Sequence, residues 1–244
     1  MISAIIIGRG GSKGLPGKNK TAINNIPLMI YPIKAAMNCK EIDKVFFSSE
    51  DKELRALADI HTNLKIELIN RPKALSTDEA IADDVFKHAK KYITKKYGEQ
   101  EALVLMFANA VGITSVMLTE MIEIYKSKNV DSICTVSQYQ EFSPFRVRKI
   151  SSGLLYPYVN NMDWEGTNSN RDSFEKSYIY DCSAAVINPN NLTKEMQEIS
   201  KPPQLWLGQY ILPYGKYRDI PCLDIDFFWQ IPQMKMWLKK YWID

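Results

Sequence analysis

Residues 5–20 read IIIGRGGSKGLPGKNK, an apolar run that leads directly into a loop of glycines and cationic side chains. Successive backbone N–H groups in a glycine-rich turn form a concave anion site, and glycine lets the backbone approach a phosphate closely. Lysine and arginine add charge-assisted hydrogen bonds to phosphate oxygens. The stretch therefore predicts a phosphate-binding loop after a buried strand. Its candidate residues are Gly8, Arg9, Gly10, Gly11, Ser12, Lys13, Lys18 and Asn19.

The loop follows neither of two familiar phosphate-binding patterns. A Walker A loop requires G-x-x-x-x-G-K-[ST], which this stretch lacks. The dinucleotide fingerprint requires a third glycine, and Lys13 stands at that position after Gly8 and Gly10. Because the loop directly follows a buried strand, a merely flexible surface turn is the weaker interpretation.

Strand-like apolar runs alternate with amphipathic helix-like runs through the first 140 residues. Strands are expected at 2–7, 43–49, 64–70, 101–108 and 130–138, and helices at 26–38, 50–60, 78–97 and 115–128. This alternation predicts a doubly wound α/β fold with a mostly parallel, Rossmann-like sheet. In such sheets ligands bind beyond the carboxyl ends of the strands, where the loop is expected to lie.

From residue 140 onward the pattern changes. Residues 140–176 are rich in aromatic, Asn and Arg residues and have little helical periodicity, which indicates an insertion of loops and short strands. A strand at 178–189, a short helix at 192–200, and a final strand followed by a helix over 221–244 are expected next. With no linker or internal repeat, a single domain is expected over 1–244, with 140–176 as its insertion.

The composition argues against several classes of protein. The 31 basic and 28 acidic residues give a net charge of +3, too balanced for a general nucleic-acid or membrane binder. The four cysteines form no C-x-x-C pair, which argues for reduced thiols and against zinc. No basic residue precedes the short N-terminal apolar run, and no apolar window has membrane-span length. A cytoplasmic protein is expected.

Residues 9–19, RGGSKGLPGKN, resemble the signature ARGGSKG-x-P-x-KN of the acylneuraminate cytidylyltransferases, the CMP-sialic acid synthetase family. RPKALSTDEA at 71–80 resembles the family's RPAELATD segment. The stretch at 170–187 more loosely resembles its R-x-D…NGAIY region, and LDID at 223–226 resembles its paired-aspartate motif. The motifs keep their order, and the resemblance spans almost the whole chain.

The resemblance implies transfer of CMP from CTP to an acceptor oxygen, with release of pyrophosphate and with Mg²⁺. Arg9 and Lys18 would then contact the CTP phosphates, the remaining loop residues would line the same cradle, and Arg71 would lie near the nucleotide. Asp224 and Asp226 would ligate the metal, since residues at i and i+2 of a strand project to one face. Catalysis by this route needs no covalent intermediate on the protein.

Other polar residues have simpler explanations. Ser76 and Asp78 stand just before or at the start of the helix expected at 78–97, where they would serve as helix caps. His61 and His88 are isolated on helix-like stretches and are expected to be structural. No histidine base is therefore expected.

The acceptor side departs from the family pattern. MFANAVGITSV at 106–116 does not reproduce the glutamine, threonine and arginine of the family's LQPTSPLR-like segment, and DCSAA replaces its NGA. We expect CTP as donor and an anionic acceptor: a nonulosonic acid, a phosphorylated polyol or sugar, or a phosphonate, for surface polysaccharide or glycoconjugate synthesis. Arginine suits bidentate binding of such anions. The candidate acceptor-binding residues are Asn109, Arg146, Arg148, Arg171 and Asp181, with Gln209 as a further candidate.

Two alternative functions remain open. A sugar-phosphate nucleotidyltransferase using another nucleotide would normally carry the loop LAAGxGxR, which is absent. An inactive nucleotide-binding module would have no need of the aspartate pair.

The family commonly pairs two subunits through a segment like 140–176, so a homodimer is expected. Arg146 and Arg148 would alternatively belong to that contact or to a solvated strand edge. The aromatic residues available for it are Phe142, Phe145, Tyr156, Tyr158 and Trp164.

Overall fold

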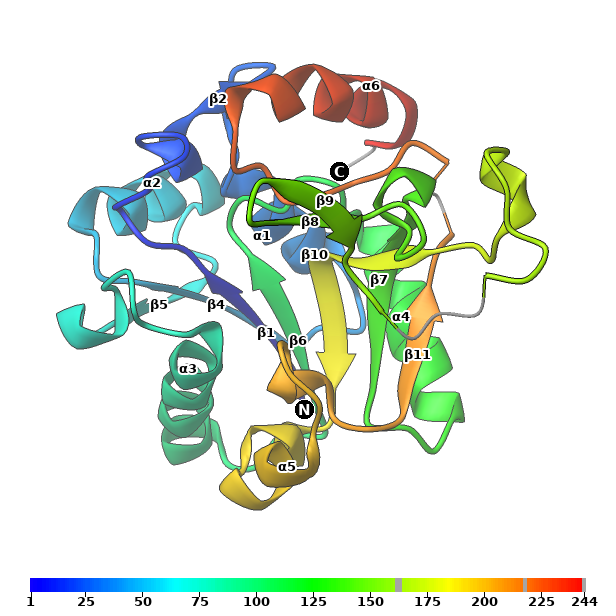
Figure 1. Ribbon diagram of the computed structural model, residues 1–244. Helices are drawn as coiled ribbons and strands as arrows, with labels where there is room; N and C mark the ends of the chain where they lie inside the picture. Colours follow the sequence, from blue (N-terminus) through cyan, green and yellow to red (C-terminus); the bar gives the residue numbers. More distant parts are fainter. Residues whose placement is uncertain (161–163, 217–218, 243–244) are drawn as a thin grey trace.

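The computed structural model describes residues 1–160, 164–216 and 219–242. Within these ranges one seven-stranded sheet has the order β11-β7-β10-β6-β1-β4-β5 (Figure 1). The apolar run at the N-terminus forms β1, which pairs in parallel with both β4 and β6. The strands are β1 (Ile2–Ile7), β4 (Lys44–Ser49), β5 (Glu67–Asn70), β6 (Ala102–Phe107), β7 (Ser132–Gln138), β10 (Tyr178–Ile187) and β11 (Ile211–Tyr214).

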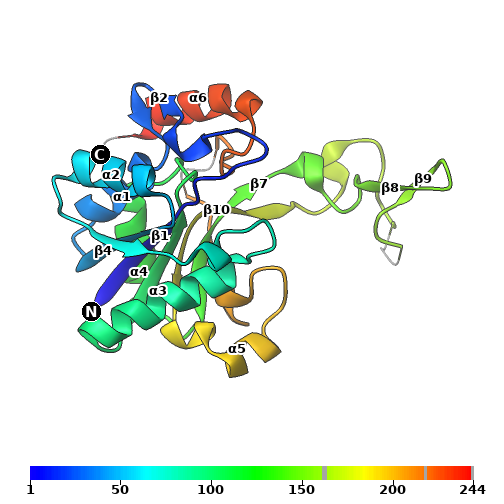
Figure 2. The same cartoon turned by 90° about the vertical axis from the view of Figure 1, so that its left-hand side faces the viewer.

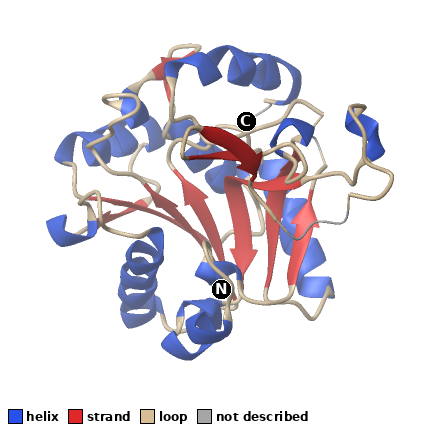
Figure 3. Ribbon diagram, viewed as in Figure 1, coloured by secondary structure: helices blue, strands red, loops and turns tan. Residues whose placement is uncertain are grey.

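Helices pack on both faces of the sheet, which confirms the doubly wound α/β prediction (Figure 3). One face is covered by a first core, which takes side chains from α1 (Ile30–Asn38), α2 (Lys52–Thr62), α4 (Ser115–Ser127) and α6 (Ile231–Tyr241). A second core covers the other face and takes side chains from α3 (Ala82–Tyr97). The short helix α5 (Lys194–Ile199) lies near α3.

Alternate side chains of β1 enter these two cores. Ile2, Ala4 and Ile6 face the first core, whereas Ile5 and Ile7 face the second. All five are buried. A strand buried on both faces has no polar side to present to water, which is why this segment is apolar apart from Ser3, which is itself buried. The same burial fixes the position of the loop that follows it.

The later part of the chain differs from the prediction in two places. The prediction of a strand after residue 221 is wrong, because residues 220–226 form no strand; β11 forms earlier, at the sheet edge beside β7. Pro213 within β11 weakens the strand signal in the sequence, although an edge strand tolerates proline. β10 is antiparallel to both β6 and β7, which makes the sheet mixed at this point.

Two helix starts are also later than the sequence suggests. α3 begins at Ala82 rather than at residue 78, and α1 begins at Ile30 because β3 (Ile26–Pro27) precedes it and pairs with β2 (Ala22–Ile23). Pro32 lies in the first turn of α1, where a missing N–H removes no helical hydrogen bond. The predicted helices are otherwise confirmed, with ends shifted by a few residues.

Part of the predicted insertion forms an arm, defined here as residues 139–160 and 164–177, which projects from the body of the molecule (Figure 2). Its hairpin consists of β8 (Arg148–Ser151) and β9 (Leu154–Pro157), which pair in antiparallel register. Ser152 and Gly153 have positive φ angles at the turn between them. Among the described residues, no helix has both the length and the apolar character needed to cross a bilayer.

Candidate active site

The residues of the predicted phosphate loop follow the carboxyl end of β1, and a pocket lies there. One part of its lining is polar and cationic, with Arg9, Lys18 and Arg71 among its residues. Another part is apolar, with Leu75 and Phe107. The pocket therefore combines a cationic region with an apolar region, as a nucleotide requires. Its other lining residues include Gly8, Gly11, Ser12, Asn19, Thr77, Asp78, Val85, Asn109 and Asp224.

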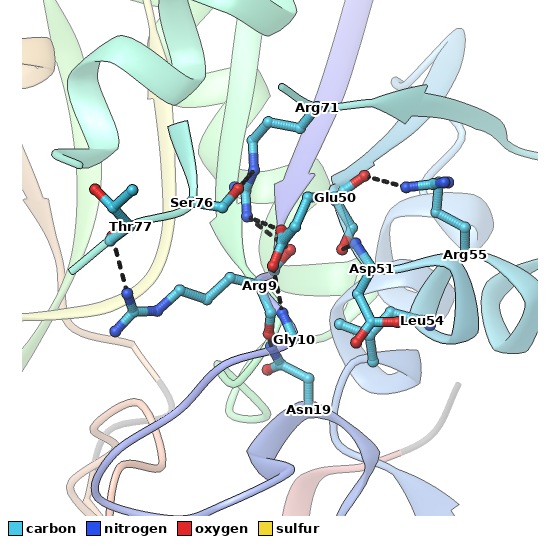
Figure 4. A network of polar contacts seen from close by, with 12 residues as sticks. Arg9, Gly10, Asn19, Glu50, Asp51, Leu54, Arg55, Arg71, Ser76 and Thr77 are labelled. Atoms are coloured by element: carbon cyan, nitrogen blue, oxygen red, sulfur yellow. Dashed lines mark hydrogen bonds and ion pairs between the residues drawn. The ribbon is translucent and has the colours of Figure 1, made fainter. Parts of the chain in front are cut away.

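Polar contacts hold the loop from beneath (Figure 4). Asn19 Nδ2 donates to the carbonyl oxygen of Arg9 at 2.9 Å, and the Gly10 N–H donates to Glu50 Oε1 at 2.8 Å. Gly11 and Ser12 line the pocket, and their backbone N–H groups donate to no residue that the structure describes. Those two N–H groups are therefore available to an anion.

Glycine at position 14 permits a close approach between the loop and the chain that carries the aspartates. A Cβ atom added there would lie 2.7 Å from the backbone oxygen of Asp226. Such a contact is closer than real Cβ atoms tolerate, so Gly14 lets these two segments pack together.

Glu50 and Arg71 form a buried ion pair under the loop. Arg71 Nη2 lies 2.7 Å from Glu50 Oε2, and their side chains are 3% and 17% exposed. Arg71 also donates to the Gly8 carbonyl oxygen at 3.1 Å and to Ser76 Oγ at 2.9 Å. Burial acts to raise the pKa of Glu50, but hydrogen bonds from Gly10 and Arg71 outweigh it and lower the pKa. Arg71 thus joins the loop, the end of β4 and the 71–80 segment.

Asp224 and Asp226 lie together, although not on a strand as expected. Asn109 Nδ2 lies 3.0 Å from Asp224 Oδ2 and 3.4 Å from Asp226 Oδ1. The backbone of Ile225 bonds Asn109 in both directions, at 3.1 Å each. Gln230 Oε1 accepts from the N–H groups that follow Ile225. Side-chain and single backbone bonds, rather than a strand ladder, therefore hold the two carboxylates.

The environment of Asp224 disfavours the charged form of its carboxyl group. Burial raises the pKa of Asp224, and the charge of Asp226 raises it further. Lys18 forms an ion pair with Asp226. Lys18, predicted for the phosphates, therefore links the loop to the aspartate pair.

The donor set fits a magnesium–nucleotide complex. Mg²⁺ commonly uses one or two protein carboxylates, with waters and substrate phosphates completing its octahedron. Asp224 and Asp226 supply two carboxylates beside the phosphate loop, and their mutual repulsion would be relieved by a cation. Within the described part of the chain, no group of three or more His, Cys, Asp or Glu residues is arranged for a metal.

Asp78 does not cap α3, contrary to the expectation. The N-cap of α3 is Ile81, which makes no side-chain cap. Asp78 instead pairs with Arg9 Nη1 at 3.0 Å and with Lys13 Nζ at 2.6 Å. Ser76 accepts the bond from Arg71 rather than capping the helix. These two residues therefore belong to the pocket and its support.

Asp181, predicted for the acceptor site, is fully buried, and its carboxylate holds neighbouring strands. It accepts from Thr135 Oγ1 at 2.5 Å and from Ser137 Oγ at 2.8 Å. It lies where the register of β10 against β7 is irregular, and the following Cys182 has a φ of 58°. Ser137 in turn bonds the backbone of Cys222 in both directions. Asp181 thus supports the segment that carries the aspartate pair.

Two of the arginines predicted for the acceptor lie away from this pocket. Arg146 and Arg148 are on the arm, in a hollow with Trp164, and the Arg148 guanidinium lies 5.7 Å from the centre of that ring. They are not among the residues that line the pocket beside β1. The side chain of Arg171 lies outside the described residues. Gln209 donates to the Ile199 carbonyl oxygen at 3.0 Å on the exposed surface.

Sequence reasoning missed one residue of this site. Glu50 bonds the loop and Arg71 directly, yet it carries no motif signal. It does follow a buried strand that ends at the same sheet edge as the loop. A polar residue at that position was the available signal.

Comparisons with known proteins give a consistent family. A model of the family described as Cytidylyltransferase matches residues 3–104. One relative is a protein of Helicobacter pylori (strain ATCC 700392 / 26695). Its name is pseudaminic acid cytidylyltransferase and UDP-2,4-diacetamido-2,4,6-trideoxy-beta-L-altropyranose hydrolase. It is 28% identical to this chain over 197 residues, which cover 80% of this chain and 36% of that protein. The N-acylneuraminate cytidylyltransferase of Escherichia coli O18:K1:H7 (strain RS218 / NMEC) is 28% identical over 146 residues, which cover 60% of this chain and 33% of that protein. The chain thus spans about a third of the length of these curated relatives.

Solved structures share the fold over nearly the whole chain. A CMP:2-keto-3-deoxy-manno-octonic acid synthetase complexed with CTP has a TM-score of 0.65 at 11% identity, covering 98% of each chain. A 4-diphosphocytidyl-2C-methyl-D-erythritol synthase from Anaerococcus prevotii DSM 20548 has a TM-score of 0.65 at 13% identity, covering 98% and 96%. At these identities the likeness concerns the fold alone. The matched family model and the curated relatives thus make this chain similar to the cytidylyltransferases, with a divergent likeness to the N-acylneuraminate cytidylyltransferases at 28% to 31% identity.

Proposed function

We propose that this protein is a nucleotidyltransferase that transfers CMP from CTP to an anionic acceptor and releases pyrophosphate. The observation that carries the proposal is a pocket that joins the cationic glycine loop to Asp224, with Asp226 beside it. The relatives named as cytidylyltransferases support CTP as the donor. A structural neighbour solved as a complex with CTP supports the same donor.

The loop side of the pocket would bind the triphosphate. The N–H groups of Gly11 and Ser12 would donate to phosphate oxygens, and Arg9 and Lys18 would balance their charge. The apolar lining around Leu75 would face the nucleoside. This division would orient the α-phosphorus toward the aspartate end of the pocket.

In the proposed reaction a deprotonated acceptor oxygen attacks the α-phosphorus in line, and where that oxygen belongs to a hydroxyl, its proton passes to solvent. The new P–O bond forms as the bond from the α-phosphorus to the oxygen that bridges it to the β-phosphorus breaks. The electron pair leaves with pyrophosphate. Lys18, placed beside Asp226, would stabilise charge that develops in this step. Asp224 and Asp226 would hold Mg²⁺, which when bound supplies charge neutralisation and lowers the pKa of a coordinated hydroxyl. Asn109 would keep the two carboxylates in register.

The acceptor class rests on the relatives and on charge. Relatives named for pseudaminic acid and N-acylneuraminate favour a nonulosonic acid, in a pathway to a surface polysaccharide or glycoconjugate. A phosphorylated polyol or sugar, or a phosphonate, remains the second class. Arg146 and Arg148 would meet such an anion only if the arm of another copy brought them to this pocket.

The first prediction concerns nucleotide choice. Pyrophosphate release is expected with CTP, and at least about tenfold less with ATP, GTP or UTP, when a panel of nonulosonic acids, polyol phosphates and phosphonates is supplied with Mg²⁺. A coupled phosphate assay measures it. Release with ATP, GTP or UTP but never with CTP would contradict the proposal and favour another sugar-phosphate nucleotidyltransferase. CTP binding without turnover of any acceptor would favour an inactive binding module.

The second prediction concerns a homodimer formed through the arm. The arm exposes apolar side chains to solvent: Ile150 is 79% exposed, Leu154 60% and Leu155 67%. Side chains of this kind in one projecting hairpin are typical of an interface. Light scattering is expected to give twice the chain mass for the wild type and the chain mass for Leu155→Asp. Ile60→Asp changes a similarly exposed side chain on α2 and should leave the dimer intact. A monomeric wild type would contradict the proposal.

A further inference from the structure

The cationic residues of the phosphate loop already have anionic partners in this structure. Arg9 Nη1 lies 3.0 Å from Asp78 Oδ1, and Lys13 Nζ lies 2.6 Å from Asp78 Oδ2. The two oxygens of one carboxylate thus serve two cations of the loop. Arg9 also donates to the Thr77 carbonyl oxygen at 3.0 Å, so its guanidinium reaches across to this segment (Figure 4).

The segment that carries Asp78 forms one wall of the pocket. It connects β5 to α3, and Leu75, Thr77 and Asp78 all line the pocket. Its base is fixed, because Arg71 donates to Ser76 Oγ. Asp78 itself has no role in capping α3. Its contacts with Arg9 and Lys13 are therefore the structural function that remains for this side chain.

We propose that Asp78 is an internal counter-anion, which occupies Arg9 and Lys13 until a triphosphate displaces it, and so sets the affinity for nucleotide and pyrophosphate. This inference rests on the proposed function of the pocket. Displacement is required because phosphate oxygens and the Asp78 carboxylate would compete for the same N–H donors, and two anions at one site repel each other.

The contacts of Asp78 with Arg9 and Lys13 are weak enough for a phosphate group to displace them. The side chains of Arg9, Lys13 and Asp78 are 38%, 79% and 45% exposed, and exposed ion pairs of this kind are weak. A hydrogen bond from Lys13 lowers the pKa of Asp78, and Arg9 adds to this effect, so the carboxylate is charged at neutral pH. A nucleotide that must break such contacts binds only those chains in which they are already broken. Its apparent affinity is therefore reduced in proportion to the fraction of such chains.

The test compares Asp78→Asn with Glu79→Gln by isothermal titration with CTP and, separately, with inorganic pyrophosphate. Glu79 is the adjacent exposed acid and forms no ion pair with a described residue, so its variant removes the same charge without removing the contacts. Asp78→Asn is expected to lower the Kd of both ligands by about 3- to 10-fold, the scale of one or two exposed ion pairs. Glu79→Gln should lower the Kd of each ligand by less than about twofold.

Several outcomes distinguish this inference from the proposed function. If the wild type binds CTP but Asp78→Asn binds it equally or more weakly, Asp78 is not a competitor and the inference fails alone. An equal increase in affinity in both variants would assign the effect to net charge and would also overturn the inference. If the wild type binds none of the four nucleoside triphosphates, the proposed function and the inference fail together. Melting curves of both variants establish that they fold.

Discussion

Replacing Asp224 or Asp226 by asparagine is expected to lower kcat/KM for CMP transfer by about 100- to 10,000-fold. Removing either carboxylate removes a ligand for the metal, whose charge stabilisation is worth several kcal/mol. Asparagine keeps the shape of the side chain, so the bond from Asn109 can still form. Steady-state pyrophosphate release with CTP and Mg²⁺ measures the loss.

Stability separates a metal-binding role from a structural one. Because burial and the neighbouring charge raise the pKa of Asp224, its ionised form is disfavoured in the fold, and Asp224→Asn should melt at the same temperature or higher. Asp219→Asn is the matched control, since Asp219 pairs with Lys240 at 2.5 Å and does not line the pocket. Its activity should be unchanged. Full activity in both Asp224→Asn and Asp226→Asn would remove them as metal ligands.

The sequence predicted those parts of the fold that depend on local pattern. β1 and β6 read as apolar runs because both of their faces are buried, and the loop after β1 reads as glycine and cation because it must approach a phosphate. α2 forms where the amphipathic run at 50–60 predicts a helix, and Asp51 caps it by accepting from two backbone N–H groups of its first turn. Each of these signals lies within a few residues of the feature it predicts.

Contacts between distant segments could not be predicted in this way. The spacing of Asp224 and Asp226 suggested a strand, but Asn109 and Gln230 hold that segment through side-chain bonds, which leave no periodic pattern. Asp181 faces inward at an irregular point of β10, and an irregular register changes the face that a side chain takes. The sequence position alone did not reveal that irregularity.

The direction in which the arm points is another feature that the sequence does not predict. Because arginine suits anions, the sequence favours Arg146 and Arg148 for the acceptor site, yet they lie on the arm, in a hollow beside Trp164. Composition predicted an insertion at 140–176 but not where it would point (Figure 2). Their role toward the acceptor therefore stays a prediction that depends on how two copies associate.

The second large effect is expected from the ion pair beneath the loop. Glu50→Ala should lower the free energy of unfolding by about 3–5 kcal/mol, because it leaves the buried guanidinium of Arg71 without its charge partner. For a chain of this size about 2–4 °C is lost per kcal/mol, so the midpoint should fall by about 6–20 °C. Calorimetry or circular dichroism measures the shift.

Two further variants show whether the buried charge is the cause. Glu53→Ala removes an exposed partner of Lys20 from α2 and should change the midpoint little, since its carboxylate is 75% exposed. Glu50→Gln keeps an acceptor for the Gly10 N–H and should lose less stability than Glu50→Ala. Both Glu50 variants should also weaken CTP binding, because Arg71 loses its charge partner in each of them and, in Glu50→Ala, the Gly10 N–H also loses its acceptor. Equal, small shifts in Glu50→Ala and Glu53→Ala would mean that Arg71 finds another partner or water, and the pair would then not be what holds the loop.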